Sequence, residues 1–482
     1  MITFVPPPRL LESPRGRDWP PMPAGHAPLT PPPATADVAV VGAGPAGLAV
    51  ASALWHLGVR DVALLDRDGR PCGRFLDRID TLGQRVLRSP YEHHPGVEGY
   101  RDCELLDFAR LHWSSLTPDE RREIRMAQSG HRSVVPVDVF EAYCRHIATL
   151  HHVDERTWRA DVREVRPAAD RVTVGGEGFA LRARHVVLCL GEERREAPAD
   201  WWEGEATPAG VTYWDQPVPA DVRRLVVVGA GLSAAHLIAN ALNAGVRVDW
   251  VLRATEERYQ CADVNASFFR AEGRARFDGT SWEDRLALMG GHRRASVMFE
   301  FRPLMERAEA EGRLTVHRGR AVTAVAPEPS GGRAVVLADG ERVVGDHVVL
   351  ALGTVVSNGA QVLPEELVGA RDGWPDLDER TLAYRAAPQV SAVGAAACMV
   401  LGPAARNIDG HRVATARVAG AIAARLAEAG LLPRAQDPAC VPAGTGAALV
   451  PAARAALDGP EGPDGHDGHD VRDVPEREFA HA

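Results

Sequence analysis

The feature that most constrains the fold is a glycine-rich turn between two apolar segments near the N-terminus. Residues 37–68 read DVAVVGAGPAGLAVASALWHLGVRDVALLDRD, which predicts a buried strand, a tight turn, a helix and a second strand. Gly42, Gly44 and Gly47 have the G-x-G-x-x-G spacing, which combines a tight turn, close approach of the backbone to a phosphate, and close packing of helix on strand. The segment therefore predicts the pyrophosphate-binding turn of a dinucleotide site at a helix N-terminus.

The residues around this turn indicate how it would hold a nucleotide. Asp66 ends the second strand 22 residues after Gly44, where a carboxylate accepts the hydroxyls of a ribose. A glycine turn without a ligand is the alternative, but the two apolar strands and the acid at this distance favour a ligand. The residues predicted to bind this first nucleotide are Gly42, Gly44, Pro45, Ala46, Gly47, Asp66 and Arg67.

A second segment, residues 224–253, repeats the order of strand, glycine turn, helix and strand. Gly229 and Gly231 keep the first two glycine positions, and Ala234 takes the third, a change that the fingerprint allows. Arg253 stands 22 residues after Gly231, the same count that places the acid in the first unit. A guanidinium there suits the 2′-phosphate of NADP, whereas a solvated arginine at a strand end is the alternative. The residues predicted to bind this second nucleotide are Gly229, Gly231, Leu232, Ser233, Ala234 and Arg253.

Length and composition limit the remaining possibilities. With 482 residues and 45% hydrophobic content, the chain exceeds what one core usually serves, so we expect two or three domains. A formal net charge of −10 without a long basic run argues against nucleic acid as the main partner. Seven cysteines without a C-x-x-C pair suggest reduced thiols in a cytoplasmic protein. No apolar run reaches the roughly eighteen residues of a membrane span, so no membrane partner is expected.

Two dinucleotide units, one ending in an acid and the other in a base, suggest two cofactors, FAD first and NADPH second. The predicted fold class is α/β, with two Rossmann-like dinucleotide-binding domains, the NADPH domain being inserted into a discontinuous FAD domain. Between the two units we expect packing helices, an antiparallel meander, and a buried strand in which Cys189 is a core residue. The expected boundaries are 1–36 for an irregular proline-rich N-terminus, 37–215 and 346–432 for the FAD domain, 216–345 for the NADPH domain, and 433–482 for a disordered tail.

In this order of units the chain resembles the two-dinucleotide-domain flavoproteins, which include disulfide reductases, flavin-containing monooxygenases and amino-acid N-hydroxylases. HVVLALG, residues 347–353, resembles the late strand that returns to the FAD domain in these enzymes. The segment from 390 onward resembles their closing element, in which a strand ending at Gly394 leads to a helix facing the flavin. The resemblance therefore implies that Gly353, Gly394 and Asn407 contact FAD. The missing cysteine pair disfavours the disulfide reductases.

The motif forms separate the remaining subclasses. Flavin-containing monooxygenases carry F-x-G-x-x-x-H before the second glycine turn, whereas this chain has Tyr213 and Trp214 where the histidine would be sought. GAGPAGLA resembles the G-x-G-P-x-x-L form of the N-hydroxylases. GAGLSAAHLIA resembles their G-x-G-x-S-A-A-E form, with Ser233 retained and His236 in place of the acid. DVNASFF resembles the segment that holds an asparagine near nicotinamide and substrate, and Asn265 is the matching position.

The resemblance implies a specific chemistry. NADPH would reduce FAD, dioxygen would add to the reduced flavin, and the resulting peroxyflavin would transfer oxygen to a small nucleophilic substrate, an amine being favoured. Asn265 would position nicotinamide or substrate, with a loop asparagine that binds nothing as the alternative. The competing function is a reductase that passes NADPH electrons to another protein or a quinone. Homo-oligomerisation is compatible with the sequence.

Two polar clusters remain. GPAARNIDGHR, residues 402–412, is predicted to bind flavin at the start of a helix that runs from about His411 to 429; binding a substrate carboxylate is the alternative. His411 is also a candidate general acid or base. His93 and His94 are adjacent but have no third ligand at a recognisable spacing, so polar contacts are favoured and no metal site is expected.

Overall fold

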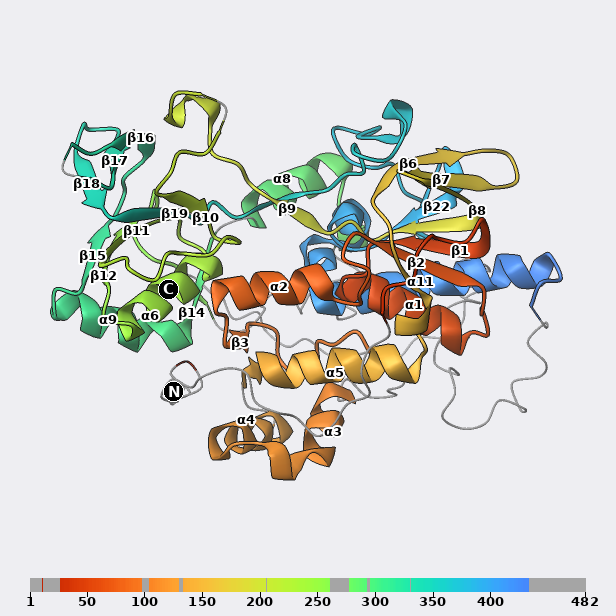
Figure 1. The fold of residues 1–482 in the computed structure, drawn as a ribbon. Helices are drawn as coiled ribbons and strands as arrows, with labels where there is room; N and C mark the ends of the chain where they lie inside the picture. The colour runs from red at the N-terminus through yellow and green to blue at the C-terminus, as the bar shows by residue number, and fades with distance from the viewer. Residues whose placement is uncertain are drawn as a thin grey trace, which may run out of the picture.

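The computed structural model describes residues 11, 27–97, 104–129, 133–204, 206–260, 277–292, 295–329 and 331–432. They form two α/β domains side by side, each built on a largely parallel sheet (Figure 1). The predicted fold class, with two Rossmann-like domains, is confirmed.

The first domain is built on an eight-stranded sheet in the order β21-β22-β8-β1-β2-β5, extended by β6 and β7 beside β8. Its centre is parallel, because β1 pairs in parallel with β2 and β8, and β22 pairs in parallel with β8. The strands β6, β7 and β8 are antiparallel, which confirms the predicted meander. The strands are β1 Thr35–Val41, β2 Val62–Asp66, β5 Thr157–Arg159, β6 Val162–Pro167, β7 Val172–Gly176, β8 Phe179–Leu188, β21 Ala383–Tyr384 and β22 Ala387–Ala392.

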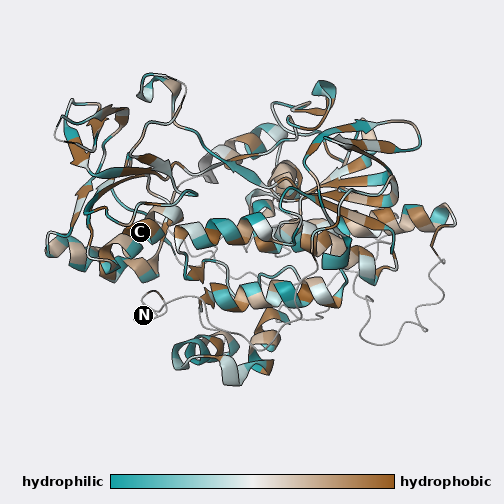
Figure 2. Ribbon diagram, viewed as in Figure 1, coloured by the Kyte–Doolittle hydropathy of each residue, from teal (hydrophilic) through white to brown (hydrophobic). Residues whose placement is uncertain are grey.

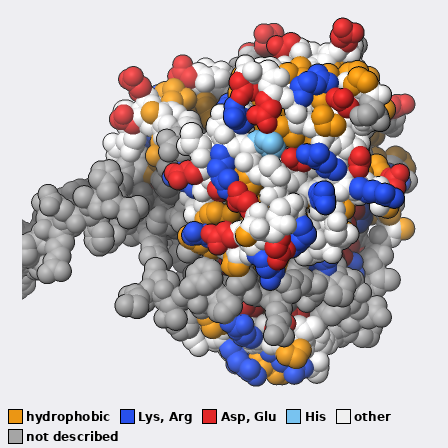
Figure 3. Space-filling model, turned by 90° about the vertical axis from the view of Figure 1, so that its left-hand side faces the viewer, with side chains coloured by type: hydrophobic (Ala, Val, Ile, Leu, Met, Phe, Trp, Pro, Cys, Tyr) orange, Lys and Arg blue, Asp and Glu red, His pale blue; other side chains and the backbone are white. Residues whose placement is uncertain are grey.

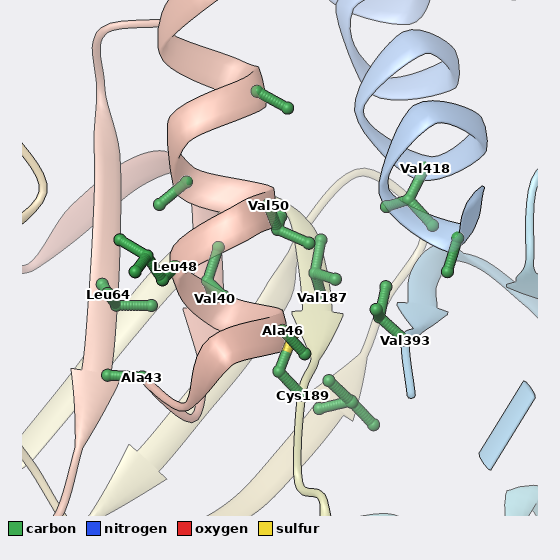
Figure 4. Packing of buried hydrophobic residues seen from close by; sticks show 14 of the residues in the cluster. Val40, Ala43, Ala46, Leu48, Val50, Leu64, Val187, Cys189, Val393 and Val418 are labelled. Atoms are coloured by element: carbon green, nitrogen blue, oxygen red, sulfur yellow. The ribbon is translucent and has the colours of Figure 1, made fainter. Parts of the chain in front are cut away.

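Helices cover this sheet and extend away from it. The first and last helices, α1 and α11, pack together over the parallel strands, and Val50 of α1, Val187 of β8 and Val418 of α11 meet in the core (Figure 4). One of the packing helices expected between the two units is short, because α3 ends at Leu111 and a 3-10 turn follows it. The helices are α1 Pro45–His56, α2 Gly73–Leu82, α3 Glu104–Leu111, α4 Pro118–Gln128, α5 Val137–Leu150 and α11 Ile408–Glu428.

The second domain is built on a five-stranded parallel sheet in the order β10-β19-β11-β12-β15. The antiparallel strands β16, β17 and β18 form a separate small sheet beside it. Its strands are β10 Val211–Tyr213, β11 Arg224–Val228, β12 Arg247–Val251, β15 Leu314–His317, β16 Val322–Pro327, β17 Arg333–Leu337, β18 Arg342–Gly345 and β19 His347–Leu350. Its helices are α6 Leu232–Asn243 and α9 Arg302–Ala310, whereas α8 Trp282–His292, which follows in the chain between them, packs against the core of the first domain.

The position of β19 corrects one prediction. The segment 347–353 was expected to return to the FAD domain, but β19 pairs with β10 and β11 and lies inside the second sheet. A short, continuously apolar strand fits the centre of either sheet, so its local sequence does not identify its neighbours. The sheet of the second domain consequently draws on residues 211–350, and the return to the first domain begins after β19.

The chain crosses between the domains on two short antiparallel strands, β9 and β20. They are β9 Glu192–Arg194 and β20 Thr354–Val356. Helix α2 is fastened to this crossover, because Arg74 donates two hydrogen bonds to Glu193 and Arg78 donates to the carbonyl oxygen of Glu192 at 3.1 Å. Hydrogen bonds from two arginines of the first domain therefore hold the crossover in place.

Hydropathy follows this architecture. The central strands of both sheets are mostly brown in Figure 2, whereas α2 and α5 carry teal residues among the apolar ones. Among the helices in the described ranges, none combines the length and apolar content that crossing a bilayer requires.

Candidate functional site: two nucleotide turns and the crossover between them

The first glycine turn follows β1 and is closely packed. Gly42 has φ +98°, and a Cβ there would collide with the carbonyl oxygen of Cys189. A Cβ on Gly47 would collide with the carbonyl oxygen of Gly42, so helix and turn approach as closely as the motif predicts (Figure 4). At Gly44, by contrast, a Cβ would meet nothing within 4 Å. No described atom therefore obstructs the middle of the turn, which precedes the first turn of α1 with Pro45 and Ala46, and this is compatible with the predicted pyrophosphate contact.

The acid at the end of β2 performs a task that the sequence does not reveal. Asp66 Oδ2 accepts the backbone N–H of Ala43 at 2.9 Å, and Oδ1 accepts that of Asp68 at 2.9 Å. Asp66 thus fastens the glycine turn to the second strand. Each carboxylate oxygen accepts about two hydrogen bonds, so the predicted ribose contact remains compatible with this geometry. Arg67 lies beside it with its side chain 68% exposed and pairs with Asp161.

The second glycine turn repeats this geometry with different supports. Gly229 has φ +130°, and a Cβ there would collide with the carbonyl oxygen of Ala351. Around Gly231 the nearest atom to an added Cβ is that of Ala295, at 4.0 Å, so this turn is open as well. Leu232 and Ser233 then begin α6, followed by the fully buried Ala234. The predicted residues thus surround the N-terminus of α6, where a pyrophosphate would be stabilised.

Arg253 lies two residues beyond β12 and is exposed. Within the part of the chain that the structure describes, its guanidinium takes part in no ion pair. Other arginines of this domain are paired: Arg318 with Glu309, and Arg302 with Glu306. Basic and acidic side chains are accordingly interspersed on this face (Figure 3). The exposure of Arg253 is compatible with the predicted contact to a 2′-phosphate, which stays a prediction.

The crossover carries the third group of predicted residues. Glu192 of β9 accepts hydrogen bonds from Arg406, at 2.6 Å, and from Thr354. Its Oε1 is buried without a hydrogen-bond partner among the described residues. Gly353 adjoins this group, since its carbonyl oxygen accepts the backbone N–H of Arg195 at 2.9 Å. Glu192 and Thr354 have no motif of their own, whereas Arg406 belongs to the predicted cluster 402–412, and only the fold brings the three together.

His411 lies next to this group, near the start of α11. Asn407 is the N-cap residue of that helix, and Gly430, with φ +70°, follows its end, which confirms the helix predicted from His411 onward. His411 Nε2 would lie 3.6 Å from a Cβ on Gly394, which has φ +89° after β22. The structure therefore brings the predicted Gly394, Asn407 and His411 to one place.

The protonation of His411 follows from its burial. Removal from water lowers its pKa to about 4, although the nearby Glu192 acts in the opposite direction. Nδ1 is buried without a hydrogen-bond partner among the described residues. At neutral pH the ring is consequently uncharged, which fits a hydrogen-bonding contact better than the general acid considered from the sequence.

The adjacent histidines make polar contacts, as expected. His94 Nδ1 accepts the backbone N–H of Gly96 at 3.2 Å and lies 3.1 Å from the Tyr143 hydroxyl. Burial lowers the pKa of His94 to about 3, and the positive charge of Arg412 adds to the effect. His93 Nε2 lies 3.8 Å from a carboxylate oxygen of Asp409. The described ranges contain no group of three or more His, Cys, Asp or Glu side chains suited to a metal ion.

Two further predictions concern asparagine and cysteine. Asn265 lies outside the described residues. Cys189 is buried, as expected, and its burial raises the pKa of the thiol, which opposes nucleophilic reactivity. The described cysteines are all buried, and none forms a disulfide with another described cysteine; they are Cys72, Cys144, Cys189 and Cys398.

The geometry defines a class of protein with two FAD/NAD(P)-type dinucleotide-binding domains. Two family models match the chain, one described as NAD(P)-binding Rossmann-like domain over residues 40–100 and one as FAD-NAD(P)-binding over residues 298–355. They confirm the prediction of two such modules, with FAD and a nicotinamide dinucleotide as the cofactors. No curated protein matches the chain in sequence.

Solved structures share the fold. The ornithine hydroxylase PvdA of Pseudomonas aeruginosa, in its reduced form, matches with a TM-score of 0.65 at 18% identity over 81% of this chain and 100% of its own. The ornithine N-hydroxylase KtzI of Kutzneria sp. 744 matches with a TM-score of 0.64 at 17% identity over 81% and 99%. The bacillithiol disulfide reductase Bdr of Bacillus cereus matches with a TM-score of 0.53 at 16% identity over 81% and 99%.

Proposed function

We propose that the protein is an FAD-dependent, NADPH-consuming monooxygenase that transfers oxygen to a small nucleophilic substrate, an amine being favoured. The observation that carries the proposal is a pair of glycine turns in one chain, each with open space beside its middle glycine. In the first unit an acid ends the following strand, and in the second unit an arginine without an ion pair among the described residues lies at the corresponding place. The better fold match to two ornithine hydroxylases than to a disulfide reductase supports it.

In this proposal the first turn holds FAD. The open side of Gly44 and the start of α1 bind the pyrophosphate, and Asp66 adds a ribose contact to its two backbone contacts. The flavin supplies the redox and oxygen chemistry when bound, and the chain positions the reactants and excludes water. Gly394 and Asn407 would border the flavin at the start of α11.

NADPH would bind at the second turn. The N-terminus of α6 faces the pyrophosphate, and Arg253 donates charge-assisted hydrogen bonds to the 2′-phosphate. The crossover strands β9 and β20 join the two sites. The bond between Arg406 and Glu192 fixes the start of α11 to that crossover, so the position of the flavin depends on both domains.

An amine can act as a nucleophile only when it is uncharged. A site with few water molecules disfavours the ammonium form, because desolvation lowers the pKa of an amine. His411 is uncharged at neutral pH and has a buried ring nitrogen available for a hydrogen bond, so we assign it to orienting the substrate or the flavin edge. A structural role in filling the space beside Gly394 is the competing assignment.

Substrate-dependent turnover tests the proposal. The purified protein should be yellow, and amines, amino acids and thioethers should be screened under air for NADPH oxidation with mass-spectrometric detection of products. Product containing one added oxygen atom, in proportion to the NADPH consumed, supports the monooxygenase. NADPH oxidation that yields only hydrogen peroxide, together with fast anaerobic reduction of a quinone, supports the reductase instead. Colourless protein that cannot be reconstituted with FAD overturns both.

A further inference from the structure

We propose that Glu192 is the hydrogen-bond acceptor for an N–H group of a ligand bound at the crossover between the domains, the ligand being the substrate amine or the flavin ring. The inference rests on the monooxygenase proposed above and assigns a residue that no predicted motif contains. Glu192 is the first residue of β9, one of the two strands on which the chain crosses between the domains. Its side chain is 18% exposed, so the carboxylate lies at the edge of the interior.

The two oxygens of this carboxylate differ in their partners. Oε2 accepts hydrogen bonds from Arg406, at 2.6 Å, and from the hydroxyl group of Thr354. Oε1 is buried and has no hydrogen-bond partner among the described residues. A carboxylate oxygen accepts about two hydrogen bonds, and a buried acceptor without a donor destabilises the fold. The state of Oε1 therefore indicates that a ligand supplies its donor.

The start of the crossover has open space for such a ligand. Gly191 precedes β9 and Gly353 precedes β20; both glycines are exposed, and a Cβ built on either would meet no atom within 4 Å beyond its chain neighbours. Gly191 also lines a narrow hollow at the carboxyl ends of β8 and β22, together with apolar residues such as Leu190 and Val393. Ligands of open parallel sheets bind at this end of the strands. The last torsion of a glutamate side chain is broad, so the carboxylate of Glu192 can turn Oε1 toward a ligand while β9 stays in place.

Arg406 determines which N–H groups suit this acceptor. Its guanidinium offsets much of the charge of Glu192, and a positive charge beside an amine favours the uncharged form that the proposed reaction needs. A neutral primary amine can donate one N–H to Oε1 and keep its lone pair available. The ring nitrogen Nδ1 of His411, which also has no partner among the described residues, lies in the same group, since the charge of Glu192 acts on the pKa of His411. A flavin ring offers N–H groups as well, N3–H in both redox states and N5–H in the reduced state.

Two measurements on the full-length, FAD-loaded protein test the assignment and identify the ligand. In Glu192→Gln the amide oxygen can keep the bond from Arg406, so the amide nitrogen takes the place of Oε1 and presents donors instead of an acceptor. If the ligand is the amine, calorimetric titration should show the Kd for n-butylamine rising about tenfold or more, whereas that for butyl methyl thioether, which has no N–H, stays unchanged. If the ligand is the flavin, the midpoint potential of FAD without substrate should shift by about 30 mV or more, which corresponds to a tenfold change in the relative affinity for its two redox states.

Thr354→Val is the matched control, because it removes one of the two donors to Oε2 and leaves Oε1 as it is. It should change neither the amine affinity nor the potential. Equal changes in Thr354→Val and Glu192→Gln would make Glu192 a structural residue of the crossover and overturn the proposal, and so would a Glu192→Gln protein unchanged in both measurements.

Glu192→Asp replaces Glu192→Gln in both measurements if thermal unfolding shows that the glutamine variant is not folded. It keeps the charge but withdraws the oxygens by one methylene, so a smaller change in the same measurement is expected, and no change overturns the proposal. A wild-type protein that binds FAD but transfers oxygen to no substrate overturns the proposed monooxygenase instead, and the potential of its FAD then still decides the role of Glu192.

Discussion

The two glycine turns share one backbone design and differ in what supports it. In the first, Asp66 binds two backbone amides, and Gly47 lies against the carbonyl oxygen of Gly42. In the second, the corresponding carbonyl oxygen, that of Gly229, accepts the indole N–H of Trp250 at 2.6 Å, and Ala234 is accommodated where the first turn needs glycine. Each turn is thus fastened from the second strand of its own sheet, the first by a carboxylate that is also the predicted ribose contact and the second by an indole N–H.

This difference matches two kinds of ligand. A group that stays bound through many turnovers gains from a site whose charged residue is already ordered, as Asp66 is by its two hydrogen bonds. A nucleotide that binds and leaves in every cycle suits an exposed side chain such as that of Arg253. The structure therefore favours FAD as the retained cofactor and NADPH as the exchanging one, and each half of this comparison can be tested separately.

The largest effect is expected in the first turn. In Gly47→Ala the added methyl group would collide with the carbonyl oxygen of Gly42, which forces helix and turn apart. Such overpacking typically lowers the free energy of unfolding by about 1–3 kcal/mol. The variant should therefore be less stable and lose FAD. Gly44→Ala is the control, since its methyl group meets no atom within 4 Å and should weaken FAD binding while the fold stays intact. Thermal unfolding and the FAD content after purification measure both. A fully flavinated, stable Gly47→Ala would contradict the packing argument.

The next largest effect is expected for Arg253, which occupies the place in the second unit that Asp66 occupies in the first. Arg253→Ala should raise the KM for NADPH about tenfold or more, because a charge-assisted hydrogen bond contributes on the order of 1.5–3 kcal/mol. The KM for NADH should change little, so the preference for NADPH should shrink. Arg302→Ala is a useful control, because Arg302 lies in the same domain but pairs with Glu306. An unchanged ratio of NADPH to NADH efficiency in Arg253→Ala would mean that this arginine does not read the 2′-phosphate.

These comparisons also show what the sequence can predict. The two turns, their flanking strands and helix α11 depend on local spacing, and the structure has them where the patterns place them. Gly42 and Gly229 have the positive φ angles that the motif requires. Such features need no knowledge of distant residues, because the backbone conformation and the hydrophobic period lie within one segment.

Contacts between segments that are distant in the sequence could not be predicted in this way. Nothing in HVVL indicates that β19 joins the second sheet, because an apolar strand has suitable neighbours in both. The bond from Arg88 to Ser296 joins residues 208 positions apart, and that from Arg406 to Glu192 joins residues 214 apart. A single sequence shows the residue types at these positions but not the fold that brings them together. Most of the candidate site that lies between the domains is of this kind.

A smaller effect tests the support of the second turn. Trp250→Phe removes the indole N–H of a buried side chain from the carbonyl oxygen of Gly229 and leaves that partly buried oxygen without its donor, which costs about 1 kcal/mol. Trp282→Phe is the matched control, because its indole donates to Asp372 at an exposed site, where water can replace the lost partner. Urea unfolding should therefore show a larger loss for Trp250→Phe. Equal losses in the two variants would indicate that the indole contact does not support the turn.

Acid should weaken the first domain more than the second. Burial lowers the pKa of His94 and His151 to about 3 and that of His185 and His411 to about 4, and these four lie in the first domain. The second has two, His236, lowered to about 3, and His347, whose pKa burial also lowers. An unfolded histidine titrates near 6.5, so between about pH 6.5 and 4 the unfolded chain binds protons that the folded chain does not. The free energy of unfolding therefore falls as the pH falls through this window.

Replacing one of these histidines measures its contribution to the pH dependence of the free energy of unfolding. His151→Gln should reduce the loss of unfolding free energy between pH 7.5 and 5.5 by about 1.4 kcal/mol, because each buried neutral histidine contributes about that amount at one pH unit below 6.5. Glutamine does not titrate and can still hydrogen-bond to His56, whose Nε2 lies 2.7 Å from that of His151. His152→Gln serves as the control for the same replacement at the neighbouring position, where the side chain is 45% exposed. If His151→Gln keeps the full pH slope, burial of this ring does not penalise its charged form, and the acid sensitivity of the first domain must come from other groups.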